Sequence, residues 1–451
     1  MVSRREFSKI LAIAGTSAFG AKEMLAPWAA HAQMPTKATA ASKAAAASHI
    51  DRAWVKETLL KNLLDHWLTA SVTPSGFIQE NLDRQWKPYG TQREASLNGQ
   101  GRQLYCMVMG YEHSRDKRYL EAIDKCADFL LKMRDPQYGG YYNRTTPDLK
   151  PIDDTKTGYT SFTIFPLAHA ARVTGNKKYA DAALQSWREV STKMRDGQFF
   201  YNSMKRDFSG VAPMTVGNPS TAAGQARPAG MVRRAHGLNV HMFEALLALY
   251  ETTKSQEVWA EITKEMAAFE KMYDYERGYL PEGYDDNWKA PAPQSYNVGH
   301  LFEWGSLFSR AVELGADKKF IPLGSRSIDL GLKVGWDQAT GGVWMIAKPE
   351  GGPARDYMIW WTQCETMKAT ARYATLHGRT DLWPYFDKSM AFIKQSFLDH
   401  EYGGWFEGVI PGKPREALGD RAYLKGAVDG PELGSYHQTT MLTDLLHLLQ
   451  A

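Results

Sequence analysis

The sequence predicts an all-α fold, an (α/α)6 barrel in which six helix hairpins close into a ring. Two observations predict it. A glycine followed by aromatic or other apolar residues recurs at intervals of roughly 60 residues, and each copy lies between an amphipathic segment and a more apolar one. The copies are Gly76-Phe77-Ile78, Gly140-Tyr141-Tyr142, Gly197-Gln198-Phe199-Phe200, Gly278-Tyr279-Leu280, Gly342-Val343-Trp344 and Gly404-Trp405-Phe406.

The first helix of each hairpin is expected in an outer ring, because its apolar residues recur at three- and four-residue spacing. These segments are 53–70, 117–133, 177–194, 256–272, 318–334 and 382–397. The second helix of each hairpin is more apolar and is expected in an inner ring. These segments are 100–111, 160–173, 238–250, 298–314, 358–376 and 436–449. Short strands at the glycine turns are expected to be a minor feature.

The composition is that of an ordinary globular protein. The 451 residues include 54 basic and 50 acidic side chains, a net charge of +4, which is too balanced to indicate nucleic-acid or anionic-membrane binding. Aromatic residues make up 12% of the chain, which suits stacking on sugar rings or packing of a large helical core. Three cysteines, Cys106, Cys126 and Cys364, are too few to indicate a disulfide framework.

Residues 1–32 are predicted to be a twin-arginine signal peptide. Arg4-Arg5 precedes an apolar stretch at 10–21, and Ala30-His31-Ala32 has the small-x-small form of a cleavage site. The alternative is a basic N-terminus followed by a surface helix. Export would place the protein in the periplasm and make the twin-arginine machinery a partner. No later apolar run reaches the 18 or so residues that span a membrane, so no stable anchor is expected.

The remaining chain divides into a leader and one catalytic domain. Residues 33–49 are rich in Ala, Thr, Ser and Lys and are expected to form a flexible leader. Residues 50–451 are expected to form the barrel. Two long loops, 202–236 and 411–435, interrupt the repeats. Loops of this length are either lids over a site or tolerated insertions.

Histidines and carboxylates stand at the predicted starts of the inner helices, which all face one end of such a ring. His241 precedes Glu244 and His300 precedes Glu303 by three residues, so each pair shares a helical face. His437 lies at the start of the last helix. A carboxylate beside an imidazole orients it and adjusts its pKa, as general acid–base catalysis requires. One such pair alone would suit a structural role, but repetition at equivalent positions favours function.

Divalent metal binding is the competing interpretation of these residues. Two H-x-x-E pairs and a third histidine contain suitable ligand types. The zinc signature H-E-x-x-H is absent from the sequence, as are a P-loop and a dinucleotide fingerprint. We therefore expect neither a metal nor an organic cofactor.

Around these residues the chain resembles the N-acylglucosamine 2-epimerase superfamily, which includes cellobiose 2-epimerases and mannose isomerases. The resemblance extends from about residue 50 to the C-terminus. Its most specific motifs are Gly299-His300-Leu301-Phe302-Glu303-Trp304, Trp360-Trp361 with Glu365, and Tyr436-His437. Weaker matches are Gln100-Gly101-Arg102, Gly139-Gly140-Tyr141, Lys156 and His241-Met242-Phe243-Glu244.

The resemblance implies an isomerase that transfers a proton next to a sugar carbonyl, without a metal, through a cis-enediol. It implies that His300 and His437 are the acid–base pair and that His241 assists ring opening and proton shuttling. Glu303 would orient His300, and Arg102 would stabilise the developing enediolate.

The same resemblance implies the residues that bind substrate. Trp304 and Trp361 would be stacking walls, and Glu365 would accept a hydrogen bond from a sugar hydroxyl. The other implied binding residues are Trp360, Lys156, Glu244 and Tyr436.

The expected substrate is an unphosphorylated mono- or disaccharide, and isomerisation and 2-epimerisation share the same machinery. Two other classes stay open. One is an (α/α)6 glycoside hydrolase or polysaccharide lyase, for which Glu303, Glu365 and Asp154 could supply the carboxylates. The other is a glycan-binding protein without catalysis.

Overall fold

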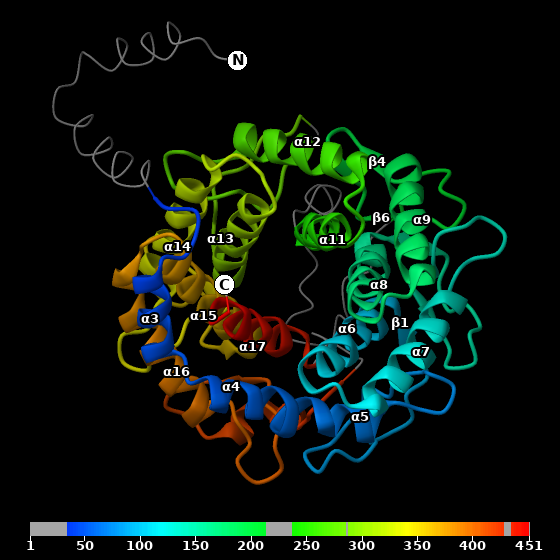
Figure 1. Ribbon diagram of the computed structural model, residues 1–451, viewed down its shortest axis with the longest axis horizontal. Helices are drawn as coiled ribbons and strands as arrows, with labels where there is room; N and C mark the ends of the chain where they lie inside the picture. Colours follow the sequence, from blue (N-terminus) through cyan, green and yellow to red (C-terminus); the bar gives the residue numbers. More distant parts are fainter. Residues whose placement is uncertain (1–33, 213–236, 286, 428–433, 451) are drawn as a thin grey trace, which may run out of the picture.

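The computed structural model is a ring of helix pairs around a central bore, and it describes residues 34–212, 237–285, 287–427 and 434–450 (Figure 1). The proposed signal peptide therefore lies outside the described residues, as does most of the loop at 202–236. The (α/α)6 barrel predicted from the sequence is confirmed: within the described chain, all regular elements other than helices are strands of two or three residues.

Six more apolar helices form the inner ring. They are α6 (Leu97–Ser114), α8 (Ser161–Thr174), α11 (Gly237–Thr253), α13 (Val298–Glu313), α15 (Trp360–Leu376) and α17 (Tyr436–Leu448). Each contacts the next in chain order, and α17 contacts α6, which closes the ring. The inner helices are enclosed on nearly all sides; in α15, for example, every residue except Trp361 is buried.

The amphipathic segments form the outer ring. They are α4 (Arg52–Glu57) with η2 (Thr58–Leu64, a π-helical stretch) and α5 (Asp65–Ser71), then α7 (Lys117–Lys132), α9 (Lys177–Lys193), α12 (Gln256–Met272), α14 (Phe320–Gly335) and α16 (Trp383–Ser396). Each presents one apolar face inward; the buried residues of α7, such as Tyr119, Ile123, Cys126 and Leu130, follow helical spacing.

The glycine–aromatic motifs are hairpin turns at the ends of the outer helices. Five of these turns are closed by isolated β-bridges, and the third is closed by the strand pair β4 (Arg195–Asp196) with β5 (Phe199–Phe200). The bridges are Val72–Ile78, Arg134–Tyr141, Asp274–Tyr279, Trp336–Val343 and Leu398–Trp405. Five of the motif glycines have φ between +60° and +85°, and in the fifth copy this conformation falls on Gly341. Glycine recurs here because it adopts positive φ without steric cost.

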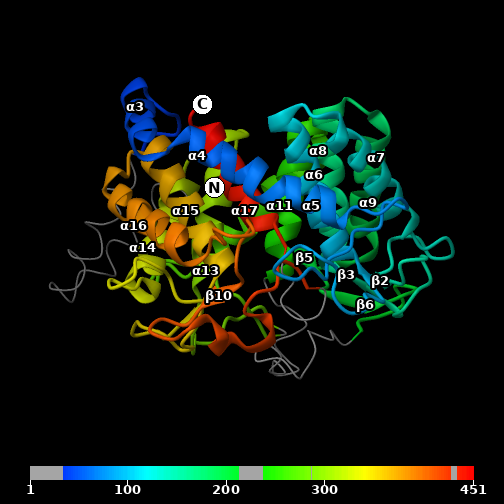
Figure 2. The ribbon, with the colours of Figure 1, turned by 90° about the horizontal axis from the view of Figure 1, so that it is seen from below.

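Short antiparallel strand pairs join neighbouring repeats where the inner helices begin. They are β1 (Ala95–Ser96) with β2 (Arg144–Thr145), β3 (Thr155–Thr157) with β6 (Ser203–Lys205), β7 (Tyr296–Asn297) with β8 (Ile346–Ala347), and β9 (Met358–Ile359) with β10 (Gly408–Val409). Figure 2 shows the strands and loops gathered at one end of the barrel, with α3 and the C-terminus toward the other. Short 3-10 turns, η3 (Gly158–Thr160), η4 (Thr380–Leu382) and η5 (Arg415–Arg421), complete the connections; η5 lies within the loop at 411–435.

A buried lysine fixes the turn of the second repeat. Lys156 on β3 donates to Asp135 Oδ2 at 2.9 Å, and Arg206 binds the same carboxylate. Both partners of the lysine pair are almost completely buried. The side chain predicted to bind substrate is therefore engaged by Asp135, in the connection between two repeats.

The sixth repeat contains the same arrangement. Lys425 donates to Asp399 Oδ2 at 2.7 Å, and Arg84 binds that carboxylate from the first repeat. Asp399 begins its turn just as Asp135 does, four residues before the first glycine of a Gly-Gly pair. The two clusters hold the barrel together across the second repeat and across the junction of first and last repeats.

The segment expected to be a flexible leader contains a helix, which corrects that expectation. α3 (Ala40–His49) begins at Thr39 with a reciprocal capping box and contacts α15. Ala46 is fully buried, and His49 Nδ1 lies 2.9 Å from Asp387 Oδ2. Alanine has the highest helix propensity of all residues, so the composition that was interpreted as flexible favours a helix once α15 covers it.

Within the described residues, no helix is long and apolar enough to cross a membrane. The three cysteines are buried and unpaired.

Candidate active site

The starts of the inner helices bring three histidines together at the loop end of the bore. His241 lies on α11, His300 on α13 and His437 on α17. The Trp361 ring on α15 lies 5.5 Å from the His300 ring and 5.6 Å from the His437 ring. His241 Nδ1 lies 3.8 Å from Glu303 Oε1, and Glu303 Oε2 lies 4.0 Å from His300 Nε2. The three imidazoles therefore surround one region.

A carboxylate that the sequence analysis did not single out binds His300. Glu282 Oε1 lies 2.7 Å from His300 Nδ1, whereas Glu303 is 4.0 Å from Nε2. Glu282, rather than Glu303, is thus the nearer hydrogen-bonding partner of this ring, and Asn297 Nδ2 lies 3.3 Å from the same nitrogen. The sequence held a signal for it, because Glu282 follows Gly278 by four residues, as Glu80 follows Gly76. The side chain of Glu80 also lines the site, in a small pocket beside His437.

Glu365 binds His437 in the same way. Its Oε1 lies 2.9 Å from His437 Nδ1, and its Oε2 lies 2.6 Å from Lys368 Nζ, one helical turn further along α15. Lys368 was not predicted from the sequence. Its signal was the E-x-x-K spacing, which places both side chains on one face of a helix that is otherwise enclosed.

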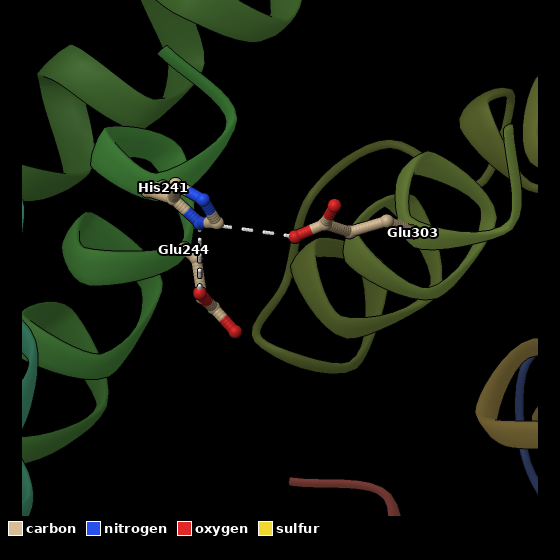
Figure 3. Close-up of side chains that lie close together, drawn as sticks. All are labelled: His241, Glu244 and Glu303. Carbon is tan, nitrogen blue, oxygen red and sulfur yellow. Dashed lines mark ion pairs between the residues drawn. The ribbon is translucent and has the colours of Figure 1, made fainter. Parts of the chain in front are cut away.

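His241 contacts a guanidinium and two carboxylates. Arg102 Nη2 on α6 lies 3.3 Å from His241 Nε2. His241 Nδ1 lies 3.8 Å from an oxygen of Glu244 and 3.8 Å from an oxygen of Glu303. Figure 3 shows both contacts as dashed lines from the His241 ring. The Tyr436 hydroxyl donates a hydrogen bond to Glu244 Oε2. The sequence-predicted residues Arg102, His241, Glu244, Glu303 and Tyr436 thus lie together.

The same carboxylates differ in protonation because their surroundings differ. Burial, followed by repulsion from Glu365, raises the pKa of Glu303 to about 8, so this group is largely protonated at neutral pH. Burial acts to raise the pKa of Glu365 as well, but the Lys368 charge and the His437 hydrogen bond outweigh it and lower that pKa. For Glu244, His241 and Lys368 outweigh burial and lower the pKa to about 2.

Burial favours the neutral form of two of the histidines. Burial lowers the pKa of His241 to about 4 and also lowers the pKa of His437. A neutral imidazole that donates from Nδ1 to a carboxylate carries its lone pair on Nε2. The His437–Glu365 pair therefore has the arrangement of a general base.

The groups that could hold a divalent cation are His241, Glu244 and Glu303. One ligand atom of each lies within 4.8 Å of the others, and no other such group occurs in the described part of the chain (Figure 3). One imidazole and two carboxylates are ligand types that divalent transition metals accept. Metal dependence is therefore open to a direct test with a chelator.

Aromatic rings shape the site. The Arg102 guanidinium lies 4.6 Å from the centre of the Phe162 ring and 4.9 Å from that of Tyr436, which holds it by cation–π contacts. A Cβ on Gly299 would lie 2.0 Å from the Trp361 ring, so only glycine permits this ring to pack against the start of α13. Trp360 is buried beside Arg102, Tyr436 and His437.

Two residues predicted at the site lie elsewhere. Trp304 is buried and packs against Phe243, Phe269 and Phe308 in the layer between the rings. Lys156 is bound to Asp135. Beyond the histidines, a cavity of about 460 Å³ occupies the other half of the bore, and Glu244 and Lys368 are part of its wall.

Comparison with known proteins assigns the chain to a family. The family model of N-acylglucosamine 2-epimerase (GlcNAc 2-epimerase) matches residues 76–416. A D-mannose isomerase from Marinomonas mediterranea is 20% identical over 328 residues, which is 67% of this chain and 76% of that protein. A mannose-6-phosphate isomerase from Rhizobium meliloti is 33% identical over 145 residues, only 31% of this chain and 37% of that protein. The structure of a cellobiose 2-epimerase from Spirochaeta thermophila has a TM-score of 0.76 at 20% identity, covering 88% of this chain and 96% of that one.

The fold and the site define an (α/α)6-barrel enzyme of the isomerase class. The chain belongs to the N-acylglucosamine 2-epimerase family, because the family model covers most of its length. The resemblance found in the sequence is confirmed, and the protein is a sugar isomerase or 2-epimerase of this family.

Proposed function

We propose that this protein removes the C2 proton of an unphosphorylated mono- or disaccharide and returns it to C1, giving a ketose, or to C2, giving the epimer. One observation carries the proposal. His300 and His437 each hold a carboxylate on Nδ1 and flank the same Trp361 ring. Two oriented imidazoles on either side of one stacking surface suit proton removal and return at one carbon.

The reaction begins after ring opening of the sugar. A neutral His437 takes the C2 proton on Nε2, and Glu365 stabilises the imidazolium that forms through the 2.9 Å hydrogen bond to Nδ1. The electron pair moves onto the carbonyl oxygen and gives a cis-enediolate. His300 acts on the opposite face, oriented by Glu282. Return of the proton to C1 or C2 then determines the product.

Positive potential at this end of the bore stabilises the enediolate. Arg102 provides a fixed cation next to His241. The inner helices α13, α15 and α17 point their N-termini here and begin without a side-chain cap, which leaves partly positive N–H groups at their starts.

The charges around the histidines support an unphosphorylated substrate. The Arg102 guanidinium lies over the Phe162 and Tyr436 rings, and Lys368 is paired with Glu365. The ionised carboxylates Glu244 and Glu365 lie around the same region, and their negative charge would repel a phosphate dianion. The relatives named D-mannose isomerase and cellobiose 2-epimerase support neutral sugars, while the shorter match to a mannose-6-phosphate isomerase makes the phosphorylated sugar a necessary comparison.

We also propose that the enzyme acts in the periplasm after twin-arginine export. The support is the order of Arg4-Arg5, the apolar stretch and Ala30-His31-Ala32. Free sugars from outside the cell would be its substrates there.

Proton NMR in deuterium oxide tests the proposed reaction. The purified protein is incubated with EDTA and with mannose, glucose, fructose, lyxose, cellobiose, N-acetylglucosamine or mannose 6-phosphate. Loss of the C2 proton signal together with a ketose or C2 epimer is expected for at least one neutral sugar, and His300→Asn and His437→Asn should each abolish it. Activity confined to mannose 6-phosphate would contradict the substrate class, and loss of activity in EDTA would contradict metal-free transfer.

The remaining classes give different products in the same experiment. A hydrolase would release reducing ends from an oligosaccharide, and a lyase would yield an unsaturated product that absorbs ultraviolet light. A binding protein would perturb sugar signals without exchanging the C2 proton. Any of these outcomes without enolisation would overturn the proposal.

A further inference from the structure

A buried lysine, Lys368, has no part in the reaction described above. It lies in the middle of α15, is 7% exposed, and forms part of the layer between the histidines and the 460 Å³ cavity. Its Nζ is 2.6 Å from Glu365 Oε2, while Glu365 Oε1 is 2.9 Å from His437 Nδ1. Lys368, Glu365 and His437 therefore form one line of charge and hydrogen bonds that ends at the proposed base.

Among the described residues, three carboxylates act on the Lys368 ammonium in this buried region. Lys368 interacts with Glu365 on its own helix, Glu244 on α11 and Glu303 on α13, and together they raise its pKa although burial acts to lower it. His437 on α17 faces the opposite oxygen of Glu365. The charge of Arg102 on α6 acts to lower the pKa of His437.

The short contact to Lys368 decides where the negative charge is placed. Glu365 has an ammonium at 2.6 Å, whereas among the described residues the nearest cation-forming groups to Glu303 are imidazole nitrogens at 3.8 and 4.0 Å. When two buried carboxylates repel each other, ionisation is favoured at the one that has a cation close by. The close ammonium of Lys368 therefore holds the negative charge on Glu365.

We propose that Lys368 is a positioning residue that keeps Glu365 ionised, so that Glu365 accepts the Nδ1 proton of His437 and Nε2 of His437 serves as the base. The proposal rests on the proposed function for its catalytic consequence. Without the ammonium, Glu365 would take up a proton and donate it to His437 Nδ1. The imidazole proton would then lie on Nε2, and His437 could not remove a proton from the substrate.

Substitution of Lys368 gives a kinetic signature that a merely structural role would not. Lys368→Met is expected to lower kcat at pH 7 at least tenfold, with KM changed less than about threefold. The acid limb of its kcat–pH profile is expected to move upward by about one unit or more, because a higher pH is needed to ionise Glu365. Lys368→Arg retains the charge and is expected to keep the wild-type limb.

A buried lysine that pairs with a different carboxylate is the matched control. Lys425→Met also removes an ammonium from a buried carboxylate, Asp399, and should lower stability while leaving the acid limb in place. A Lys368→Met enzyme with reduced kcat but an unmoved acid limb would overturn the proposal.

A measurement on the unaltered protein does not depend on folding of the variant or on a substrate. ¹⁵N NMR of histidine-labelled protein, with the His437 signals assigned by difference from His437→Asn, reports the tautomer at pH 7. A proton on Nδ1 is expected, and a proton on Nε2 would overturn the proposal. Because no sugar is needed, failure here is distinct from failure of the proposed enolisation, which the C2 exchange experiment reports.

Discussion

Four carboxylates near the bore differ in hydrogen bonding and protonation because each has different partners. Glu282 and Glu365 each bind the Nδ1 of a histidine, Glu244 accepts from the Tyr436 hydroxyl, and Glu303 lies between two imidazoles. Burial and repulsion from Glu365 raise the pKa of Glu303 to about 8, whereas the pKa values of Glu244 and Glu365 are lowered. Similar side chains thus supply both a fixed acceptor and a proton-bearing acid within a few ångströms.

The orienting role of Glu282 is testable by truncation. Glu282→Ala is expected to lower kcat roughly 10- to 100-fold with little change in KM, because His300 loses the partner that fixes its tautomer. Glu276→Ala, whose side chain is 79% exposed six residues earlier, is the control and should behave as the wild type. Steady-state kinetics with the sugar identified by NMR would measure both, and equal kcat values for the two variants would refute the role.

The raised pKa of Glu303 predicts a pH-dependent stability. Between the ordinary carboxyl pKa near 4.5 and the folded value of about 8, the folded protein holds a proton that the unfolded chain has released. Stability associated with Glu303 is therefore present below pH 4.5 and is lost as the pH rises toward 8. Glu303→Gln removes this dependence.

Thermal unfolding at pH 5.5 and pH 9 measures it. The melting temperature of Glu303→Gln relative to wild type is expected to increase by a few degrees from the lower to the higher pH. Glu276→Gln is the exposed control and should show no such change. A difference that is constant with pH would mean that the folded carboxyl is not held protonated.

At the scale of elements, the turns between outer and inner helices determine where the site lies. Each glycine turn closes one outer helix and leads through a short strand to an inner helix start. Two of these turns each contain a buried ion pair between a lysine and an aspartate. The pairs are Lys156 with Asp135 and Lys425 with Asp399. The turns therefore join neighbouring repeats as well as reversing the chain.

Removing one such lysine is expected to lower the free energy of unfolding. Lys425→Met leaves the Asp399 carboxylate buried without its ammonium, and breaking a buried pair typically costs about 3–5 kcal/mol; Arg84 still binds that carboxylate, so the lower value is expected. Chemical denaturation would measure the loss. Lys61→Met, which removes a 73% exposed partner of Asp65, is the control and should change stability by less than about 1 kcal/mol. Equal losses for the two variants would contradict the structural role of the buried pair.

At the scale of the whole molecule, the histidines gather at one end of the barrel. The loops, strands and inner helix starts lie at one end with the histidines, while α3 and the C-terminus lie toward the other (Figure 2). A fold of this kind closes without disulfides, since its three cysteines are unpaired and its inner helices are enclosed by the ring. It suits a protein that is folded before twin-arginine export.

Export itself is testable in cells. A double variant Arg4→Lys and Arg5→Lys is expected to retain the protein in the cytoplasm, since the paired arginines are what the export machinery recognises. Lys37→Arg, a charge-preserving change outside the signal, is the control. Fractionation with immunoblotting would follow both, and periplasmic recovery of the double variant equal to that of the control would refute twin-arginine export.

The sequence by itself determined the helices, the turns and the family. Helical periodicity and glycine turns are local properties, so the predicted inner and outer segments agree with the observed helices to within a few residues, as at α12 and α17. Because inner helices in such a ring all start at the same end, the sequence also predicted that His241, His300 and His437 would meet.

Only the tertiary structure decided which side chains touch. The spacing of His300 and Glu303 placed them on one face, but the hydrogen bond goes to Glu282, which a different segment supplies. Trp304 turns into the layer between the rings and Lys156 binds Asp135, because neighbouring repeats provide those partners. Ala40–His49 forms a helix because α15 covers it. Contacts between repeats depend on how the helices rotate and pack against one another, and periodicity along the chain does not specify that rotation or packing.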